Sequence, residues 1–145
     1  MNDRGTLLLV EDSRDDAYFI VRAIQKVCPG LSIAQVGDGE AARQYLAGEG
    51  EFSDRGRYPL PKLILLDIKL PRLNGLDLLE WIRSVPDHVK LPAMILSSSD
   101  EPKDVARAER LGVLGYHLKP VDPTGLERVA KCVCSSWKEI FKANS

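Results

Sequence analysis

Short apolar segments recur along the chain, and each is followed by a segment with helical spacing. The apolar segments hold four to six residues with few polar positions, which is typical of parallel strands buried on both faces. They cover residues 6–10, 31–36, 63–66, 93–96 and, more weakly, 113–118. The pattern therefore predicts five strands.

Between these strands, apolar residues recur every three or four positions, as they do on one face of a helix. After Ser13, which with Asp16 resembles a capping box, come Ala17, Ile20 and Ile24. The other predicted helices cover residues 40–46, 76–82, a segment opened by Pro102 and, longest of all, about 123–142.

A strand followed by a helix thus occurs five times, which favours an α/β fold with a doubly wound, five-stranded parallel sheet of the flavodoxin-like type. The 145 residues fit a single domain over 1–145 and leave no room for a second domain that would deliver an output. Residues 48–61 form a connection longer than usual, which we expect to be a surface excursion.

Composition narrows the classes of protein that fit this fold. The 20 basic and 21 acidic residues leave a net charge of −1, which gives no support for binding nucleic acid or an anionic membrane. The apolar run near the N-terminus is too short for a signal peptide, and no segment reaches the roughly 18 residues of a membrane helix. The three cysteines, Cys28, Cys132 and Cys134, lack metal-site spacing and suit reduced thiols. We therefore expect a cytoplasmic protein.

Polar residues follow four of the predicted strands. Glu11 and Asp12 follow the first strand, Asp67 the third, Ser97 the fourth, and the fifth leads to Lys119. Each of these residues alone has an ordinary explanation as a helix cap or a turn residue. Ligands of open α/β sheets, however, bind beyond the carboxyl ends of the strands, where these residues would meet. Together they predict a functional site.

The residue types at this site point to phosphoryl chemistry. Three carboxylates repel one another unless a cation neutralises them, and hard oxygen ligands favour Mg²⁺. An ammonium from Lys119 and a hydroxyl from Ser97 would stabilise a phosphoryl group beside the metal. A central carboxylate can act as the nucleophile and become an acyl phosphate.

Motifs around these residues resemble the receiver domain of two-component response regulators over nearly the whole length of the chain. The motifs are Leu9-Val10-Glu11-Asp12, Leu65-Leu66-Asp67-Ile68, Leu70-Pro71, Asn74-Gly75, Ile95-Leu96-Ser97 and Leu118-Lys119-Pro120. The resemblance implies that Asp67 accepts a phosphoryl group from a phosphohistidine on a sensor histidine kinase. It also implies that Glu11, Asp12, Asp67 and the backbone carbonyl of Lys69 bind Mg²⁺ as the cofactor.

The same resemblance implies a switch around the phosphoryl group. Ser97 and Lys119 would contact that group, and Lys119 would act with Asp67 in catalysis. An aromatic ring at Tyr116 would turn inward behind Ser97 and remodel the surface, as phosphorylation switches commonly do. The family often has a cis peptide bond before the residue that matches Pro120.

A narrower resemblance is to the small response regulators that partner bacterial phytochrome kinases. It rests on the long connection at 48–61, on Leu70-Pro71-Arg72-Leu73-Asn74-Gly75 and on Lys119-Pro120-Val121-Asp122. It implies a phytochrome kinase as partner, a downstream protein target, and a homodimer through the fourth helix, the fifth strand and the fifth helix. Trp137 fits either such a dimer contact or the end of the core stripe.

Two alternatives remain open. A phosphatase of the haloacid dehalogenase type uses similar residues, but it needs a second aspartate two positions after the nucleophile, where this chain has Lys69. A receiver-like binding module that is not phosphorylated in the cell is the other alternative. We expect no enzymatic turnover beyond the chain's own phosphorylation and dephosphorylation.

Overall fold

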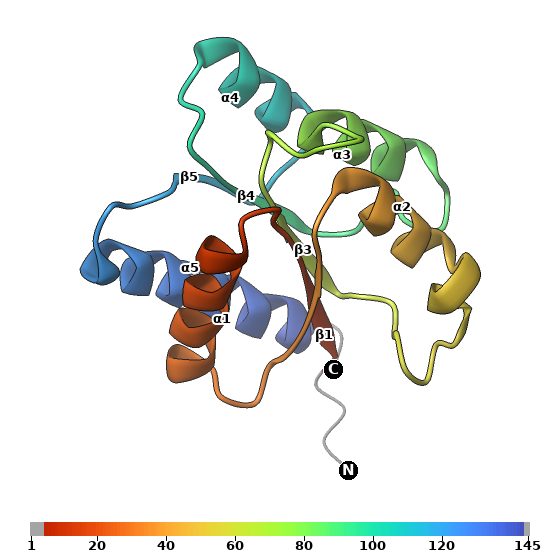
Figure 1. Cartoon of the computed structure of the whole chain (residues 1–145), viewed down its shortest axis with the longest axis horizontal. Coiled ribbons are helices and arrows are strands. Elements are labelled where there is room, and N and C mark those ends of the chain that lie inside the picture. Colours follow the sequence, from red (N-terminus) through yellow and green to blue (C-terminus); the bar gives the residue numbers. More distant parts are fainter. Residues whose placement is uncertain (1–4, 144–145) are drawn as a thin grey trace.

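All five strands run parallel in one sheet with the order β2-β1-β3-β4-β5, and helices cover both of its faces (Figure 1). The computed structural model describes residues 5–143. In chain order the elements are β1 (Thr6–Val10), α1 (Arg14–Val27), β2 (Ser32–Val36), α2 (Gly39–Ala47), the 3₁₀ helix η1 (Gly50–Ser53), β3 (Leu63–Leu66), α3 (Gly75–Ser84), β4 (Ala93–Ser97), α4 (Pro102–Arg110), β5 (Gly115–Leu118) and α5 (Pro123–Ala143). The predicted fold class is confirmed.

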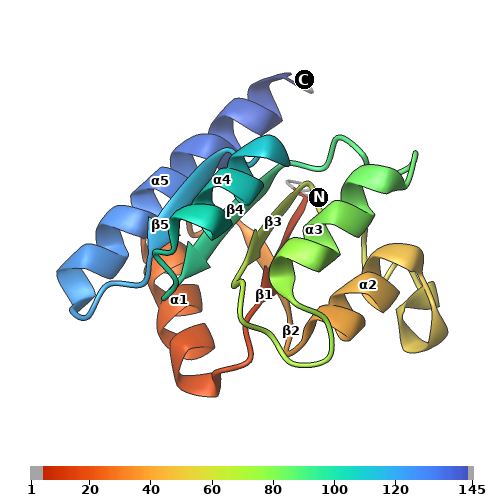
Figure 2. The ribbon, with the colours of Figure 1, turned by 90° about the horizontal axis from the view of Figure 1, so that it is seen from above.

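The core is divided between the two faces of the sheet. Because side chains alternate along a strand, Leu7 and Leu9 of β1 pack with α1 and α5, whereas Leu8 and Val10 pack with α2 and α3. Seen from above, α1 and α5 lie on one side of the sheet, and α2, α3 and α4 lie on the opposite side (Figure 2). Trp137 belongs to the α1–α5 side and is only 4% exposed, so it completes the core.

The strand order reverses at the centre of the sheet, between β1 and β3. The chain after β1 continues into α1 on one face, and the chain after β3 continues into α3 on the other. Connections that diverge in this way leave open space at the carboxyl ends of the two strands, where open α/β sheets bind their ligands.

Two parts of the chain differ from the sequence-based expectation. The fifth strand begins at Gly115 rather than 113, because its pairing with β4 starts at Gly115, opposite Met94. The connection 48–61 is more ordered than a surface excursion, since it contains η1 and buries Phe52 against Tyr45. The Arg55 guanidinium also donates hydrogen bonds to carbonyls at the end of α2.

Two simple properties of the described residues complete the fold. None of the helices between residues 5 and 143 is long and apolar enough to span a membrane. No disulfide involves Cys28, Cys132 or Cys134.

Candidate functional site

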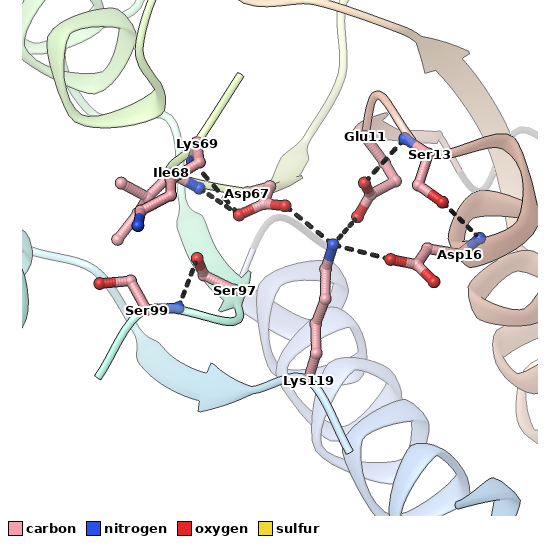
Figure 3. A network of polar contacts seen from close by, with 9 residues as sticks. All are labelled: Glu11, Ser13, Asp16, Asp67, Ile68, Lys69, Ser97, Ser99 and Lys119. Carbon is pink, nitrogen blue, oxygen red and sulfur yellow. Dashed lines mark hydrogen bonds and ion pairs between the residues drawn. The ribbon is translucent and has the colours of Figure 1, made fainter. Parts of the chain in front are cut away.

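The ammonium group of Lys119 lies at the centre of the carboxyl edge of the sheet. Its Nζ is 2.8 Å from Glu11 Oε1, 2.8 Å from Asp67 Oδ2 and 2.9 Å from Asp16 Oδ2. Figure 3 shows the three carboxylates converging on this one nitrogen from α1 and from the loops after β1 and β3. The sequence-predicted residues Glu11, Asp67 and Lys119 are therefore in direct contact.

Backbone hydrogen bonds that extend the sheet hold these residues in place. The backbone N–H of Glu11 donates to the Val36 carbonyl, and that of Asp67 donates to the Val10 carbonyl. The backbone N–H of Lys119 donates to the Ser97 carbonyl. Each of these side chains is thus attached to backbone that is hydrogen-bonded to the end of a neighbouring strand.

Burial and ion pairing have opposite effects on the charges of the site. Burial raises the pKa of Glu11, and its hydrogen bond with Lys119 offsets that rise only in part. Burial alone would lower the pKa of Lys119, but its hydrogen bonds with Asp67, Glu11 and Asp16 raise the pKa above its usual value. Lys119 is therefore an ammonium at any physiological pH.

Three carboxylates form a cluster that fits a hard divalent cation. One oxygen from each of Glu11, Asp12 and Asp67 lies within 4.8 Å of the other two. Glu11 and Asp67 are buried, whereas Asp12 is exposed and leaves one side of the cluster open to water. An all-oxygen donor set with room for water suits Mg²⁺.

The two oxygens of Asp67 have different environments. Oδ2 contacts Lys119, whereas Oδ1 accepts hydrogen bonds from the backbone N–H groups of Ile68 at 2.6 Å and Lys69 at 3.4 Å. The first residue of α3, Gly75, supports this loop by donating to the Ile68 carbonyl at 2.7 Å. A Cβ at Gly75 would overlap the backbone carbonyl oxygen of Asp67, so glycine is required there. The role of the Lys69 carbonyl as a metal ligand stays a prediction.

Ser97 is fully buried at the end of β4 and belongs to a chain of polar contacts. Its Oγ accepts a hydrogen bond from the Ser99 N–H at 3.2 Å, on the side of the site near Asp67 (Figure 3). The Ser99 hydroxyl donates to Asp104 of α4 at 2.7 Å, and the Tyr116 hydroxyl donates to the Ser99 carbonyl at 2.6 Å. One short loop therefore links Ser97 to both α4 and β5.

The structure adds two further details to the sequence-based picture. No cis peptide bond occurs among the described residues, so the bond before Pro120 is trans. The capping-box pattern of Ser13 and Asp16 predicts only a capping role for Asp16. Its backbone N–H does donate to the Ser13 hydroxyl at 3.2 Å, but its carboxylate contacts Lys119 instead of the Ser13 backbone. Its place one helical turn after Asp12 was the available signal.

Comparisons with known proteins agree with this geometry. A family model for the response regulator receiver domain matches residues 7–131. Response regulator Rcp1 of Synechocystis sp. is 30% identical over 138 residues, which cover 95% of this chain and 92% of that protein.

Two solved structures of response regulators are also similar to this chain. The phosphorylated cyanobacterial phytochrome response regulator RcpA has a TM-score of 0.83 and 31% identity, covering 92% of this chain and 93% of its own. The Mn²⁺-bound form of Rcp1 has a TM-score of 0.82 and 30% identity, covering 92% of this chain and 94% of its own. The family model spans most of the chain and the acidic cluster lies where the strands end, so the chain belongs to the response regulator receiver domains of two-component signalling.

Proposed function

We propose that this receiver domain accepts a phosphoryl group on Asp67 from a sensor histidine kinase, in a step that requires Mg²⁺. The observation that carries the proposal is the contact of Asp67 with Lys119 beside an acidic cluster of cation-binding geometry. The relatives Rcp1 and RcpA favour a kinase of the phytochrome type, because RcpA is described as a phytochrome response regulator.

The site residues would divide the phosphoryl transfer among them. An oxygen of Asp67 forms the new P–O bond while the P–N bond of the phosphohistidine breaks and the imidazole leaves with its electron pair. Lys119 and Ser97 donate hydrogen bonds to the phosphoryl oxygens, and the Ile68 and Lys69 N–H groups orient the Asp67 carboxylate. Bound Mg²⁺ would neutralise the charge of the transferring group.

The contacts of Ser99 support a switch that starts from this site. A Ser97 hydroxyl that turned to a phosphoryl group would give up the Ser99 N–H. Ser99 is bonded to Asp104 and Tyr116, so a shift of its loop would reach α4 and β5. We propose that the domain signals in this way, by changing its contacts with a downstream protein or a second copy.

Labelling with acetyl phosphate tests the proposal. We expect the wild type to be labelled with Mg²⁺ and not with EDTA, and Asp67→Asn not to be labelled at all. The control is Asp87→Asn, which removes the same charge at an exposed position and should be labelled as the wild type is. Equal labelling of Asp67→Asn and the wild type would refute the assignment.

Two further measurements separate the alternatives. A haloacid dehalogenase-type phosphatase would hydrolyse p-nitrophenyl phosphate over many turnovers, and we expect negligible turnover because Lys69 replaces its second aspartate. A phytochrome-type kinase autophosphorylated with labelled ATP should pass its label to the wild type and not to Asp67→Asn. A binding module that is not phosphorylated in the cell would take no label from the kinase.

A further inference from the structure

Among residues 5–143, the Asp16 carboxylate is the one partner of Lys119 that lies outside the acidic cluster. Glu11 and Asp67 belong to that cluster, whereas Asp16 is the third residue of α1 and 45% of its side chain is exposed. Its backbone is fixed, because its N–H donates to the Ser13 hydroxyl. The contact of Asp16 with Lys119 joins residues 103 positions apart in the chain, at 2.9 Å.

The three contacts of Lys119 use its full donor capacity, since an ammonium has three N–H bonds. A divalent cation bound to the acidic cluster would take up the oxygens of Glu11 and Asp67 and would repel the ammonium beside them. Of the three acceptors, Asp16 alone would share neither of its oxygens with the metal, so its full negative charge would stay available to Lys119. Its negative charge would also oppose the repulsion by the metal.

We propose that Asp16 is a positioning residue, which holds the Lys119 ammonium at the phosphoryl position when Mg²⁺ occupies the acidic cluster. The inference rests on the proposed function and adds to it a residue from α1. Without Asp16, Lys119 would turn toward solvent in the metal-loaded protein, and the transferring phosphoryl group would lose one of its donors.

A helix-capping role would not require this contact. Acidic residues in the first turn of a helix are favourable because of the helix dipole, and Asp15 and Asp16 both lie there. The Asp15 side chain is exposed, and no hydrogen bond or ion pair joins it to another residue in the range 5–143. Asp15→Asn therefore changes the net charge and the helix terminus as Asp16→Asn does, but leaves Lys119 untouched.

The first measurement observes Lys119 directly. Its ammonium ¹H–¹⁵N resonance, assigned by its absence in Lys119→Arg, should be visible in the metal-free wild type because the group is held in ion pairs. With saturating Mg²⁺ we expect the resonance to persist in the wild type and in Asp15→Asn, and to be lost to solvent exchange in Asp16→Asn. Retention of the resonance in Mg²⁺-loaded Asp16→Asn would overturn the inference.

The second measurement follows labelling by acetyl phosphate over a range of Mg²⁺ concentrations. Asp67 forms the new P–O bond and acetate leaves. We expect the maximal rate of Asp16→Asn to fall on the order of tenfold, a modest value for a lost charge-assisted hydrogen bond. The Mg²⁺ concentration at half-maximal rate should stay within roughly twofold, since Asp16 is not a metal ligand.

Asp15→Asn should match the wild type in both parameters. Equal maximal rates in Asp15→Asn and Asp16→Asn would overturn the inference and leave the proposed function intact. A wild type that takes no label would instead refute the proposed function, and the resonance of Lys119 would still report whether Asp16 holds it.

Discussion

At the scale of single residues, the charge of the site is strongly unbalanced. Glu11, Asp12, Asp16 and Asp67 lie close together, and the ammonium of Lys119 pairs with three of them. Ion pairs of this kind compensate for the burial of charge rather than adding much net stability. The imbalance favours a divalent cation, and it makes the site sensitive to any change in how Lys119 is shared.

A half-buried group outside the site, His117 on β5, predicts a pH dependence of stability. Burial lowers the pKa of His117 in the folded protein. Above about pH 6.5 the imidazole is neutral in both folded and unfolded chains and contributes nothing. As the pH falls below that value, the unfolded chain binds a proton that the folded chain resists, so the free energy of unfolding decreases.

His117→Gln should therefore lessen the loss of stability on acidification from pH 7 through the unfolded pKa. Urea unfolding of the wild type and the variant at several pH values measures this loss. A difference in the free energy of unfolding that stays constant with pH would contradict the prediction.

Most site residues could be predicted because each directly follows or ends a predicted strand. The proximity of Asp67 and Lys119 could be predicted from the rule that parallel strands end at a common edge of the sheet. The place of Asp16 in the site could not be predicted in the same way. Its backbone N–H caps α1 through Ser13, whereas its carboxylate contacts Lys119. Helical spacing gives its face on α1 but not a partner 103 positions away.

At the scale of secondary-structure elements, the close approach of α3 to the loop after β3 predicts the effect of one methyl group. Gly75→Ala would place its Cβ against the backbone of Asp67 and Ile68. We expect a loss of about 1–3 kcal/mol in the free energy of unfolding, together with slower labelling of Asp67.

Gly37→Ala is the matched control. A Cβ at Gly37 would meet no atom within 4 Å. Its free energy of unfolding should change by about 0.5 kcal/mol or less, and its labelling should not change. Denaturant unfolding and acetyl phosphate labelling of both variants check the pair, and similar losses in the two would show that steric contact is not the cause.

The bounds of a strand are predicted more accurately when the strand is more deeply buried. β1 and β3 are buried along their whole length, and their predicted bounds are confirmed. β5 lies at the edge of the sheet and is only half-buried. Its start was predicted two residues too early, at 113, because the apolar pattern there does not distinguish the strand from the residues before it. The aromatic packing of Phe52 and Tyr58 within 48–61 has no periodic signal, because it depends on contacts between loop residues.

At the scale of the whole molecule, exposed apolar side chains gather around β5. Leu114, Leu118 and Val121 are 54%, 51% and 102% exposed. These residues lie on or beside the edge strand that Tyr116 connects to the site. The proposed homodimer through α4, β5 and α5 would cover them.

We expect beryllium fluoride, a phosphoryl analogue, to double the 16.1 kDa mass of the chain in the presence of Mg²⁺. Light scattering measures the mass. Leu118→Asp should keep the chain monomeric, whereas Leu60→Asp, at a leucine of similar exposure far from β5 in the chain, should not. A mass that does not respond to the analogue would exclude dimerisation as the output.

The contacts of Lys119 also bear on when the site can form during synthesis of the chain. During synthesis, Glu11, Asp16 and Asp67 leave the ribosome well before Lys119, which follows Asp67 by 52 residues. The first strands can pair while their acidic ends still lack this ammonium. The functional edge of the sheet therefore gains its ammonium only after β5 has been made, later than any of the carboxylates that Lys119 pairs with.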